Sequence, residues 1–239
     1  MTNEKTVFIE VIDPLYRKLK EKDFVIDKTG CKIVELIAPR FSLNPAEPFL
    51  DFGKARKTPK KYVKAETDWY DSKSLSVDKI GKCAKTWLDI ASSSGEINSN
   101  YGWCIYSQEN YNQFYNCLKE LQHNQESRRA VMIYNRPSMW YDYNKEGMND
   151  FMCTFATQHF IRNGALISIV NMRSNDFVYG FFNDFFWQAT VHERLRQHLA
   201  RFNPVKIGEI IWLANSLHVY EHHFIMLEKL YYYSRGVYG

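Results

Sequence analysis

Short apolar segments and long helical patterns are interleaved irregularly along this chain, and that irregularity limits the folds open to it. Segments rich in β-branched and aromatic residues occupy 129–135, 159–162, 165–173 and 207–214. Apolar residues recur at helical spacing over 111–123, and the patterns over 182–202 and 218–233 are also typical of helices. Because strands and helices do not alternate regularly, the sequence predicts an α+β fold and not a doubly wound parallel sheet.

The first part of the chain adds one expected strand, at 31–38, and expected helices at 14–22, 62–70 and 80–92. The segment 39–61 carries four of the seven prolines and a basic cluster, which is typical of a surface excursion or a linker. Composition does not change across this segment, and no internal repeat is present. We therefore expect a single domain over residues 1–239.

Composition excludes some classes of protein and leaves others open. A hydrophobic fraction of 45% with 24% charged residues is ordinary for a globular protein, so wholesale disorder is excluded. The net charge of +4 is too small and too dispersed to indicate nucleic-acid binding, although it suits a small anionic ligand. The 16 Tyr, 16 Phe and 6 Trp fit either a dimer interface or a pocket that stacks planar rings.

The cysteines and the N-terminus bear on the compartment. Five cysteines, with no CxxC pair and no Cys/His cluster at zinc spacing, predict neither a disulfide framework nor a metal site. The N-terminus resembles no signal peptide, and no apolar run approaches the ~18 residues of a membrane helix. We therefore expect a cytoplasmic protein with no membrane partner. The absence of GxGxxG and Walker sequences removes the main support for dinucleotide or P-loop binding.

Three polar motifs could carry chemistry. Cys153 lies among apolar residues and is either a small core residue or a nucleophile, which would need nearby cations such as Arg128, Arg129 or Arg173 to form a thiolate. The stretch 173–176 follows an apolar strand and places a cation that suits phosphate beside several hydrogen-bonding groups; a polar turn is the alternative.

The third motif contains His218 and Tyr220. If this stretch is extended, both rings project to one face, which suits a sugar hydroxyl; the alternative is a helix N-terminus with half-buried rings. The adjacent His222 and His223 point to different faces of any regular structure, so we expect them to be structural.

Taken together, these motifs resemble the thymidylate synthase superfamily, and within it the branch that hydroxymethylates deoxycytidylate in bacteriophages. Residues 39–62 and the C-terminal tail match least well. The matching stretches lie at 22–30, 94–103, 127–129, 150–154, 170–176 and 216–220.

The resemblance implies a homodimer whose large β-sheets pack back to back and whose active sites are each completed by the partner subunit. It also implies dCMP and 5,10-methylenetetrahydrofolate as substrates, with no metal and no nucleic acid as a partner. Cys153 matches the nucleophile, and Glu66 matches the glutamate that organises proton-transfer waters. The other matched positions are Arg173, Ser174, Asn175 and Lys28 on the substrate and its phosphate, Arg128 and Arg129 donated across the dimer, His218 and Tyr220 on the 3′-hydroxyl, Tyr101 in the catalytic network and Asp176 on the folate side.

The chemistry of this superfamily explains these residue types. A thiolate adds to carbon 6 of the pyrimidine and makes carbon 5 nucleophilic. Carbon 5 attacks the folate methylene, and loss of tetrahydrofolate leaves an exocyclic methylene. A thymidylate synthase reduces that methylene with a hydride, whereas a hydroxymethylase adds water, which Glu66 would position or deprotonate.

Asp184 bears on the choice of base, because thymidylate synthases place an Asn at this position to read uracil. A carboxyl group accepts from the cytosine amino group and, if protonated, also donates to N3, so Asp184 favours cytosine. A register shift onto Asn183 would restore the amide that reads uracil. Met152 stands where thymidylate synthases usually have Pro, which fits the hydroxymethylase branch, and the tail 233–239 is short for a segment that closes over the folate.

Other functions stay open from the sequence. A dUMP or CMP hydroxymethylase, or a thymidylate synthase, would use the same residues on a different base, sugar or final step. A non-catalytic nucleotide- or RNA-binding homologue is the alternative from another class, motivated by the basic segment 39–61 and the numerous tyrosines.

Overall fold

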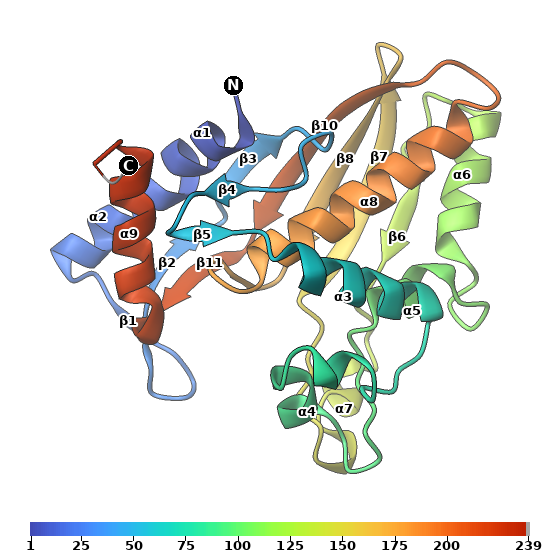
Figure 1. Ribbon diagram of the computed structural model, residues 1–239. Helices are drawn as coiled ribbons and strands as arrows, with labels where there is room; N and C mark the ends of the chain where they lie inside the picture. The colour runs from blue at the N-terminus through green and yellow to red at the C-terminus, as the bar shows by residue number, and fades with distance from the viewer. Residues whose placement is uncertain (238–239) are drawn as a thin grey trace. The chain divides into compact units, whose positions relative to one another are not determined.

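The computed structural model describes residues 1–237 (Figure 1). The chain divides into two compact units. The first contains Met1–Pro59, Ile167–Arg194 and the residues from Ile207 onward, and the second contains Lys60–Leu166 and Leu195–Lys206. The single domain expected over 1–239 stays a prediction, and the last two residues of the tail, Tyr238 and Gly239, lie outside the described residues.

Helices from both ends of the chain pack together in the first unit. They are α1 (Asn3–Val7), a π-helical turn (Phe8–Ile12), α2 (Asp13–Glu21) and α9 (Phe224–Ser234). Helix α2 confirms the helix expected at 14–22, and it ends where Lys22 takes up a left-handed conformation. The ring of Tyr16 stacks on Tyr231 at 3.8 Å, and its hydroxyl lies 2.9 Å from that of Tyr232. These contacts join α9 to the N-terminal helices.

A four-stranded mixed sheet in the first unit brings distant motifs together. Its order is β1 (Val25–Ile26), β2 (Lys32–Ile37), β11 (Ser216–Tyr220) and β9 (Asn175–Asp176). β11 is antiparallel to β2 and parallel to β9, so that His218 is the register partner of both Glu35 and Asp176.

The helix expected at 218–233 is therefore wrong over its first residues. Leu217 and Val219 are buried, and β11 pairs along its whole length with β2, so residues 216–220 are extended. Helix α9 begins only at Phe224, after a 3₁₀ turn at Glu221–His223. Pairing with a distant strand outweighs the local helical pattern here.

The segment 39–61 is not a linker. It contains β3 (Arg40–Leu43), which pairs with β10 (Lys206–Ala214), and the small hairpin of β4 (Asp51–Phe52) and β5 (Arg56–Lys57). Phe41, Leu43 and Phe52 are almost fully buried. The segment therefore contributes apolar side chains to the core of the first unit.

Aromatic side chains form much of that core. Helix α8 (Phe181–Leu199) confirms the helix expected from residue 182, and it follows β8 (Ala165–Met172), which confirms the strand expected at 165–173. Phe181, Phe182 and Phe185 of α8 are fully buried, as is Trp212 of β10. The Phe181 and Trp212 rings meet edge to face at 5.3 Å, so part of the aromatic excess fills the core.

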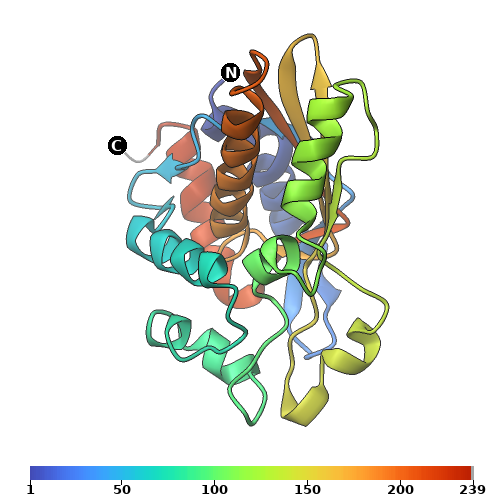
Figure 2. The same cartoon turned by 90° about the vertical axis from the view of Figure 1, so that its right-hand side faces the viewer.

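The second unit is mainly helical (Figure 2). β6 (Val131–Ile133) and β7 (Thr154–Arg162) are antiparallel in it, and α6 (Gln113–His123) packs against β6. The helix expected at 80–92 is not continuous. It is divided into a 3₁₀ turn at Ile80–Lys82 and the short helix α4 (Thr86–Ile90). The helices of the second unit are α3 (Lys60–Ser72), α4 (Thr86–Ile90), α5 (Tyr101–Tyr106), α6 (Gln113–His123) and α7 (Met139–Asp142), with a second 3₁₀ turn at Lys145–Gly147.

Glycine is required where α3 and α5 meet. A Cβ atom on Gly102 would lie 1.8 Å from the carbonyl oxygen of Tyr70, so a larger residue would force the two helices apart. This close contact holds the start of α5, and with it Tyr101, against α3.

No helix formed by residues 1–237 combines the length and the apolar character that crossing a lipid bilayer would need.

Candidate active site

The carboxyl group of Asp184 lies in the first turn of α8 and is half-buried. The side-chain nitrogen of Asn175, at the start of β9, donates a hydrogen bond of 2.8 Å to Asp184 Oδ2. Burial above all, together with the charge of Asp176, raises the pKa of Asp184 to about 7, and the hydrogen bond from Asn175 opposes this rise. Near neutral pH this carboxyl group is therefore present both as a donor and as an acceptor.

The stretch 173–176 leads the chain from β8 towards α8. Arg173 and Ser174 are half-buried, whereas Asn175 is only 2% exposed. Asp176 Oδ1 accepts hydrogen bonds from the backbone N–H of Val178 at 2.8 Å and of Tyr179 at 3.3 Å. These bonds stabilise the turn before α8, so the polar turn that the sequence left open is present and also positions the motif.

His218 and Tyr220 confirm the extended alternative, because both lie on β11. Their rings are perpendicular with centroids 5.0 Å apart. The Ser216 hydroxyl donates to Glu35, and its oxygen lies 3.2 Å from His218 Nδ1. Since that hydroxyl has one proton to donate, Nδ1 must be the donor to its oxygen, which leaves Nε2 of a neutral ring as an acceptor.

Burial lowers the pKa of His218, although Asp176 and Glu35 oppose the change. The neutral ring with an unprotonated Nε2 is therefore the form present near pH 7. Such a nitrogen accepts a hydrogen bond from an alcohol, as the 3′-hydroxyl of a deoxyribose would require.

Lys28 lies exposed in the loop between β1 and β2. Asp27 Oδ1 holds this loop by accepting from the Thr29 backbone at 2.8 Å, the Thr29 hydroxyl at 2.6 Å and the Cys31 backbone at 3.0 Å. These bonds lower the pKa of Asp27, the one from the Thr29 hydroxyl most of all. An exposed lysine on a loop held by Asp27 suits a phosphate as a point charge and not as a bidentate fork.

Cys153 belongs to the second unit and lies just before β7. It is half-buried, and its Sγ lies 3.9 Å from the carbonyl oxygen of Phe151. The Phe151 ring in turn contacts Trp140 at 5.4 Å and Tyr143 at 5.5 Å. The thiol is therefore neither sealed in the core nor fully exposed, as a nucleophile requires.

The carboxylate of Asp150 is a feature that the sequence motifs did not single out. It is 5% exposed and accepts hydrogen bonds from the backbone N–H of Asn98 at 2.8 Å and of Ser99 at 2.7 Å. The Asn98 side chain donates back to the Asp150 carbonyl oxygen at 3.1 Å and accepts from Arg136 at 2.9 Å. This network connects the loop before Cys153 to the turn before α5, and the signal for it in the sequence was the place of Asp150 at the start of the matched stretch 150–154.

Glu66 and Tyr101 are both buried in the second unit. Glu66 Oε1 accepts from the Tyr62 hydroxyl at 2.8 Å, and the Tyr62 hydroxyl oxygen in turn accepts from Trp87 Nε1 at 2.8 Å. The Tyr101 ring stacks on Tyr70 at 5.3 Å. Both candidate catalytic groups are thus held in place by aromatic neighbours.

Arg128 and Arg129 are exposed in the turn before β6. Arg129 forms an ion pair with Glu120 at 2.9 Å, and Gln158 donates to the Arg128 carbonyl oxygen at 2.8 Å. The turn is therefore ordered by its backbone and by Glu120, whose pKa is lowered first by the Ser127 hydroxyl and then by Arg129.

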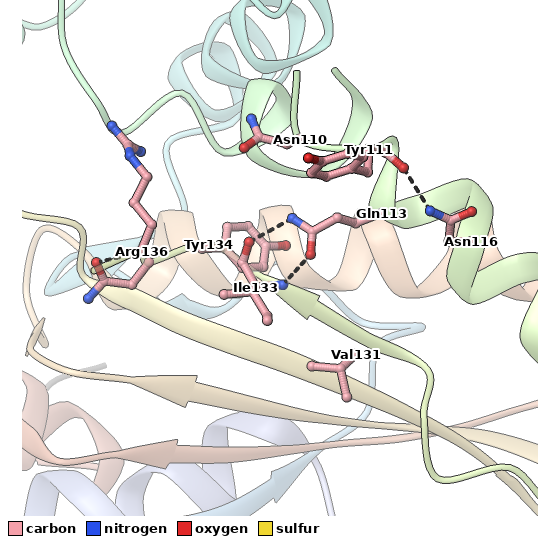
Figure 3. Close-up of a pocket in the computed structure, with 9 residues that line it drawn as sticks. Asn110, Tyr111, Gln113, Asn116, Val131, Ile133, Tyr134 and Arg136 are labelled. Atoms are coloured by element: carbon pink, nitrogen blue, oxygen red, sulfur yellow. Dashed lines mark hydrogen bonds between the residues drawn. The ribbon is translucent and has the colours of Figure 1, made fainter. Parts of the chain in front are cut away.

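A cavity of about 380 Å³ opens between the start of α6 and β6, within the second unit. Figure 3 shows the side-chain amide of Gln113 directed at the backbone of Ile133, with its nitrogen 2.7 Å from the carbonyl oxygen and its oxygen 2.7 Å from the N–H. The amide occupies backbone groups on β6 much as a neighbouring strand would. None of the predicted site residues lines this cavity, although Arg136 of the Asp150 network does.

The predicted site residues therefore fall into two sets. Within the first unit, the sheet brings Asn175, Asp176 and His218 together, with Asp184 hydrogen-bonded to Asn175. The first set contains Lys28, Arg173, Ser174, Asn175, Asp176, Asp184, His218 and Tyr220, and the second contains Glu66, Tyr101, Arg128, Arg129 and Cys153.

Comparison with known proteins identifies the class. The sequence profile described as thymidylate synthase matches residues 10–233, so the chain belongs to the thymidylate synthase family, and the α+β fold expected from the resemblance is confirmed. The chain is 51% identical over 214 residues to the deoxycytidylate 5-hydroxymethyltransferase of Enterobacteria phage T6 and 50% identical to that of phage T4, with 88% of this chain and 85% of each relative covered. It is also 28% identical over 225 residues to the thymidylate synthase of Corynebacterium aurimucosum, which covers 88% of this chain and 77% of that relative. The resemblance to this family that the motifs indicated is confirmed.

Proposed function

We propose that the chain is a folate-dependent deoxycytidylate 5-hydroxymethyltransferase. It transfers a one-carbon unit from 5,10-methylenetetrahydrofolate to carbon 5 of dCMP, adds water, and releases 5-hydroxymethyl-dCMP and tetrahydrofolate. The observation that carries this proposal is the Asp184 carboxyl, with its pKa raised to about 7, hydrogen-bonded to Asn175. The identity of about 50% to phage enzymes of that name supports it.

Cytosine requires one acceptor and one donor from the protein. Its amino group donates, and its N3 accepts. A neutral carboxyl supplies both, because the carbonyl oxygen accepts while the hydroxyl donates. Uracil presents the reverse pattern, which an Asn amide meets without any shift in pKa, so a carboxyl group with a raised pKa favours dCMP.

Cys153 is the proposed nucleophile. Its thiolate forms a bond to carbon 6, the electron pair moves to carbon 5, and carbon 5 attacks the folate methylene. Loss of the carbon 5 proton and departure of tetrahydrofolate leave an exocyclic methylene. Water adds to that methylene, the thiolate leaves carbon 6, and Glu66 is proposed to position the water and accept its proton.

The remaining residues hold the nucleotide. Arg173, Ser174 and Lys28 are proposed to bind its phosphate, and His218 with Tyr220 its 3′-hydroxyl. Tyr101 is assigned to the catalytic hydrogen-bond network and Asp176 to the folate side.

We also propose a homodimer in which Arg128 and Arg129 of one subunit reach the phosphate bound by the other. Both side chains are exposed, as residues that act across an interface must be before assembly. Because dCMP and reduced folates are cytoplasmic metabolites, the proposed place of action is the cytoplasm, that of the host cell if a phage encodes the enzyme.

Tritium release tests the proposal. Purified protein given methylenetetrahydrofolate should release tritium from [5-³H]dCMP and form 5-hydroxymethyl-dCMP, with no rise in absorbance at 340 nm. Dihydrofolate at 340 nm would identify a thymidylate synthase, whereas a preference for dUMP or CMP would identify a hydroxymethylase of another nucleotide. RNA binding without turnover of any nucleotide would favour the non-catalytic alternative.

A further inference from the structure

The amide of Asn175 is held from two sides. Trp212 Nε1 donates to Asn175 Oδ1 at 3.2 Å, and Asn175 Nδ2 donates to Asp184 Oδ2 at 2.8 Å. Trp212 is fully buried and Asn175 is 2% exposed, so water does not compete for either group. The three side chains form a single chain of hydrogen bonds, here called the Trp212 relay.

The chemistry of the indole determines the direction of this relay. An indole N–H donates and cannot accept, so the Asn175 oxygen must face Trp212 and its nitrogen must face Asp184. Asp184 Oδ2 is therefore an acceptor. Because a protonated oxygen is a poorer acceptor, the proton of the neutral carboxyl is favoured on Oδ1.

Packing keeps the relay rigid. Phe181 and Phe185 meet the Trp212 ring edge to face, at 5.3 Å with an angle of 89° and at 6.4 Å with an angle of 82°. Gly180 closes the other side, because a Cβ there would lie 3.3 Å from both Asn175 Nδ2 and Asp184 Oδ2. This packing fixes the indole ring with its N–H directed at Asn175 Oδ1, so the amide keeps its orientation as long as that donor is present.

We propose, resting on the proposed function, that Trp212 is a positioning residue for base selection, which acts through Asn175 to place the Asp184 proton where cytosine and not uracil is matched. With the proton on Oδ1, Oδ1 donates to N3 of cytosine, and Oδ2 accepts from the amino group as well as from Asn175. Uracil would need the opposite arrangement, with Oδ2 as donor to O4, and the relay disfavours it.

Without the indole N–H, Asn175 can turn its oxygen toward Asp184. The carboxyl proton would then be drawn onto Oδ2, and the advantage of cytosine would fall. Asp176 is the charged side chain that also acts on Asp184, and it stays in place in this change. The relay therefore acts on base selection separately from the covalent step at carbon 6.

The test is the substitution Trp212→Phe, which keeps an aromatic ring and removes the donor. The ratio of kcat/KM for dCMP to that for dUMP should fall by about tenfold, the size of one lost buried hydrogen bond, mainly through a higher KM for dCMP. Trp187→Phe is the matched control, because Trp187 is equally buried on α8 and belongs to no part of the relay. Its ratio should stay at the wild-type value.

A double-mutant cycle separates positioning from loss of packing. Asn175→Ala should lower the same ratio, and Trp212→Phe combined with Asn175→Ala should lower it no further, because the indole acts through the amide. Additive effects would overturn the relay. If Trp212→Phe does not fold, an unchanged dCMP-to-dUMP ratio of kcat/KM in Asn175→Ala would by itself overturn the relay. Failure of the proposed function is distinct, since wild-type protein would then release no tritium from dCMP.

Discussion

Asp150 accepts two hydrogen bonds from Ser99, one from the backbone N–H at 2.7 Å and one from the hydroxyl at 2.6 Å. Ser99 lies two residues before Tyr101, and Asp150 lies three residues before Cys153. The pair therefore connects the segment that holds the candidate nucleophile to the start of α5, across 51 residues of sequence.

Replacing Asp150 with Asn should destabilise the protein by about 2 kcal/mol, because a buried amide nitrogen would face donors that need an acceptor. The rate at which iodoacetamide alkylates Cys153 should also change. Ser99→Ala, which removes only the hydroxyl bond, should cost about 1 kcal/mol. Urea unfolding and alkylation kinetics measure both effects, and equal stability of Asp150→Asn and wild type would contradict the role assigned to the carboxylate.

Cys153→Ser should abolish tritium release from [5-³H]dCMP while dCMP still binds, because an alcohol is a far weaker nucleophile than a thiolate. Isothermal titration measures the binding. Cys83→Ser is the control, since Cys83 is exposed and lies outside the candidate site, and it should turn over at the wild-type rate. Full activity in Cys153→Ser would rule out the covalent mechanism.

Asp184→Asn should weaken the use of dCMP and improve the use of dUMP, because an amide matches uracil. In the wild type, kcat/KM for dCMP should fall as pH rises above about 7, where the carboxyl ionises. In Asp184→Asn this fall of kcat/KM with rising pH should be absent. Initial rates with dCMP and dUMP, measured over roughly two pH units either side of neutrality, test both effects. An unchanged base preference in Asp184→Asn would count against the role of Asp184.

The same group predicts how stability changes with pH. Its pKa is raised in the folded state, so between about 4 and about 7 the folded protein binds more protons than the unfolded chain does. The contribution of Asp184 to stability is therefore present at low pH and is lost as pH rises through about 7. Asp184→Asn should flatten this part of the stability curve, measured as the thermal unfolding temperature against pH.

Ser216→Ala should raise the KM for dCMP several-fold with little change in kcat, because His218 Nδ1 loses the acceptor that fixes its tautomer. The loss should disappear when 2′,3′-dideoxy-CMP is the ligand, since it has no 3′-hydroxyl for Nε2 to accept from. The dissociation constants of dCMP and 2′,3′-dideoxy-CMP, each measured for the wild type and for Ser216→Ala, provide this comparison. An equal loss for both ligands would show that Ser216 acts elsewhere.

Gly102→Ala should destabilise the protein by about 3 kcal/mol, because its Cβ would overlap the Tyr70 carbonyl oxygen between α3 and α5. Gly95→Ala is a useful comparison. Gly95 has a φ of +76° with open space around it, so its cost should be about 1 kcal/mol and purely conformational. Denaturant midpoints measure the difference, and a smaller effect at Gly102 would mean that the helices separate easily.

Local patterns in the sequence were enough to predict many elements, and the family resemblance supplied the expected chemistry. Apolar spacing located α2, α3, α6 and α8 to within a few residues, because helical periodicity is a property of neighbouring positions. The motifs around Cys153, Arg173 and His218 identified the family, which the match over residues 10–233 confirms. Asp184 followed from the resemblance, which places the Asn of thymidylate synthases at this position, and the chemistry of the two bases gave its expected role.

Tertiary structure decided the features that depend on distant residues. Residues 218–220 carry a helical pattern, yet they are extended because β2 offers a full ladder of hydrogen bonds to them. Trp212 acts on Asn175 across 37 residues, and Asp150 acts on Ser99 across 51. A buried donor finds its acceptor only after the chain has folded, so no local pattern announces the pair. The sequence by itself predicted which side chains carry the chemistry, whereas the fold decided how Asn175 and His218 are oriented and, by burial, raised the pKa of Asp184 and lowered that of His218.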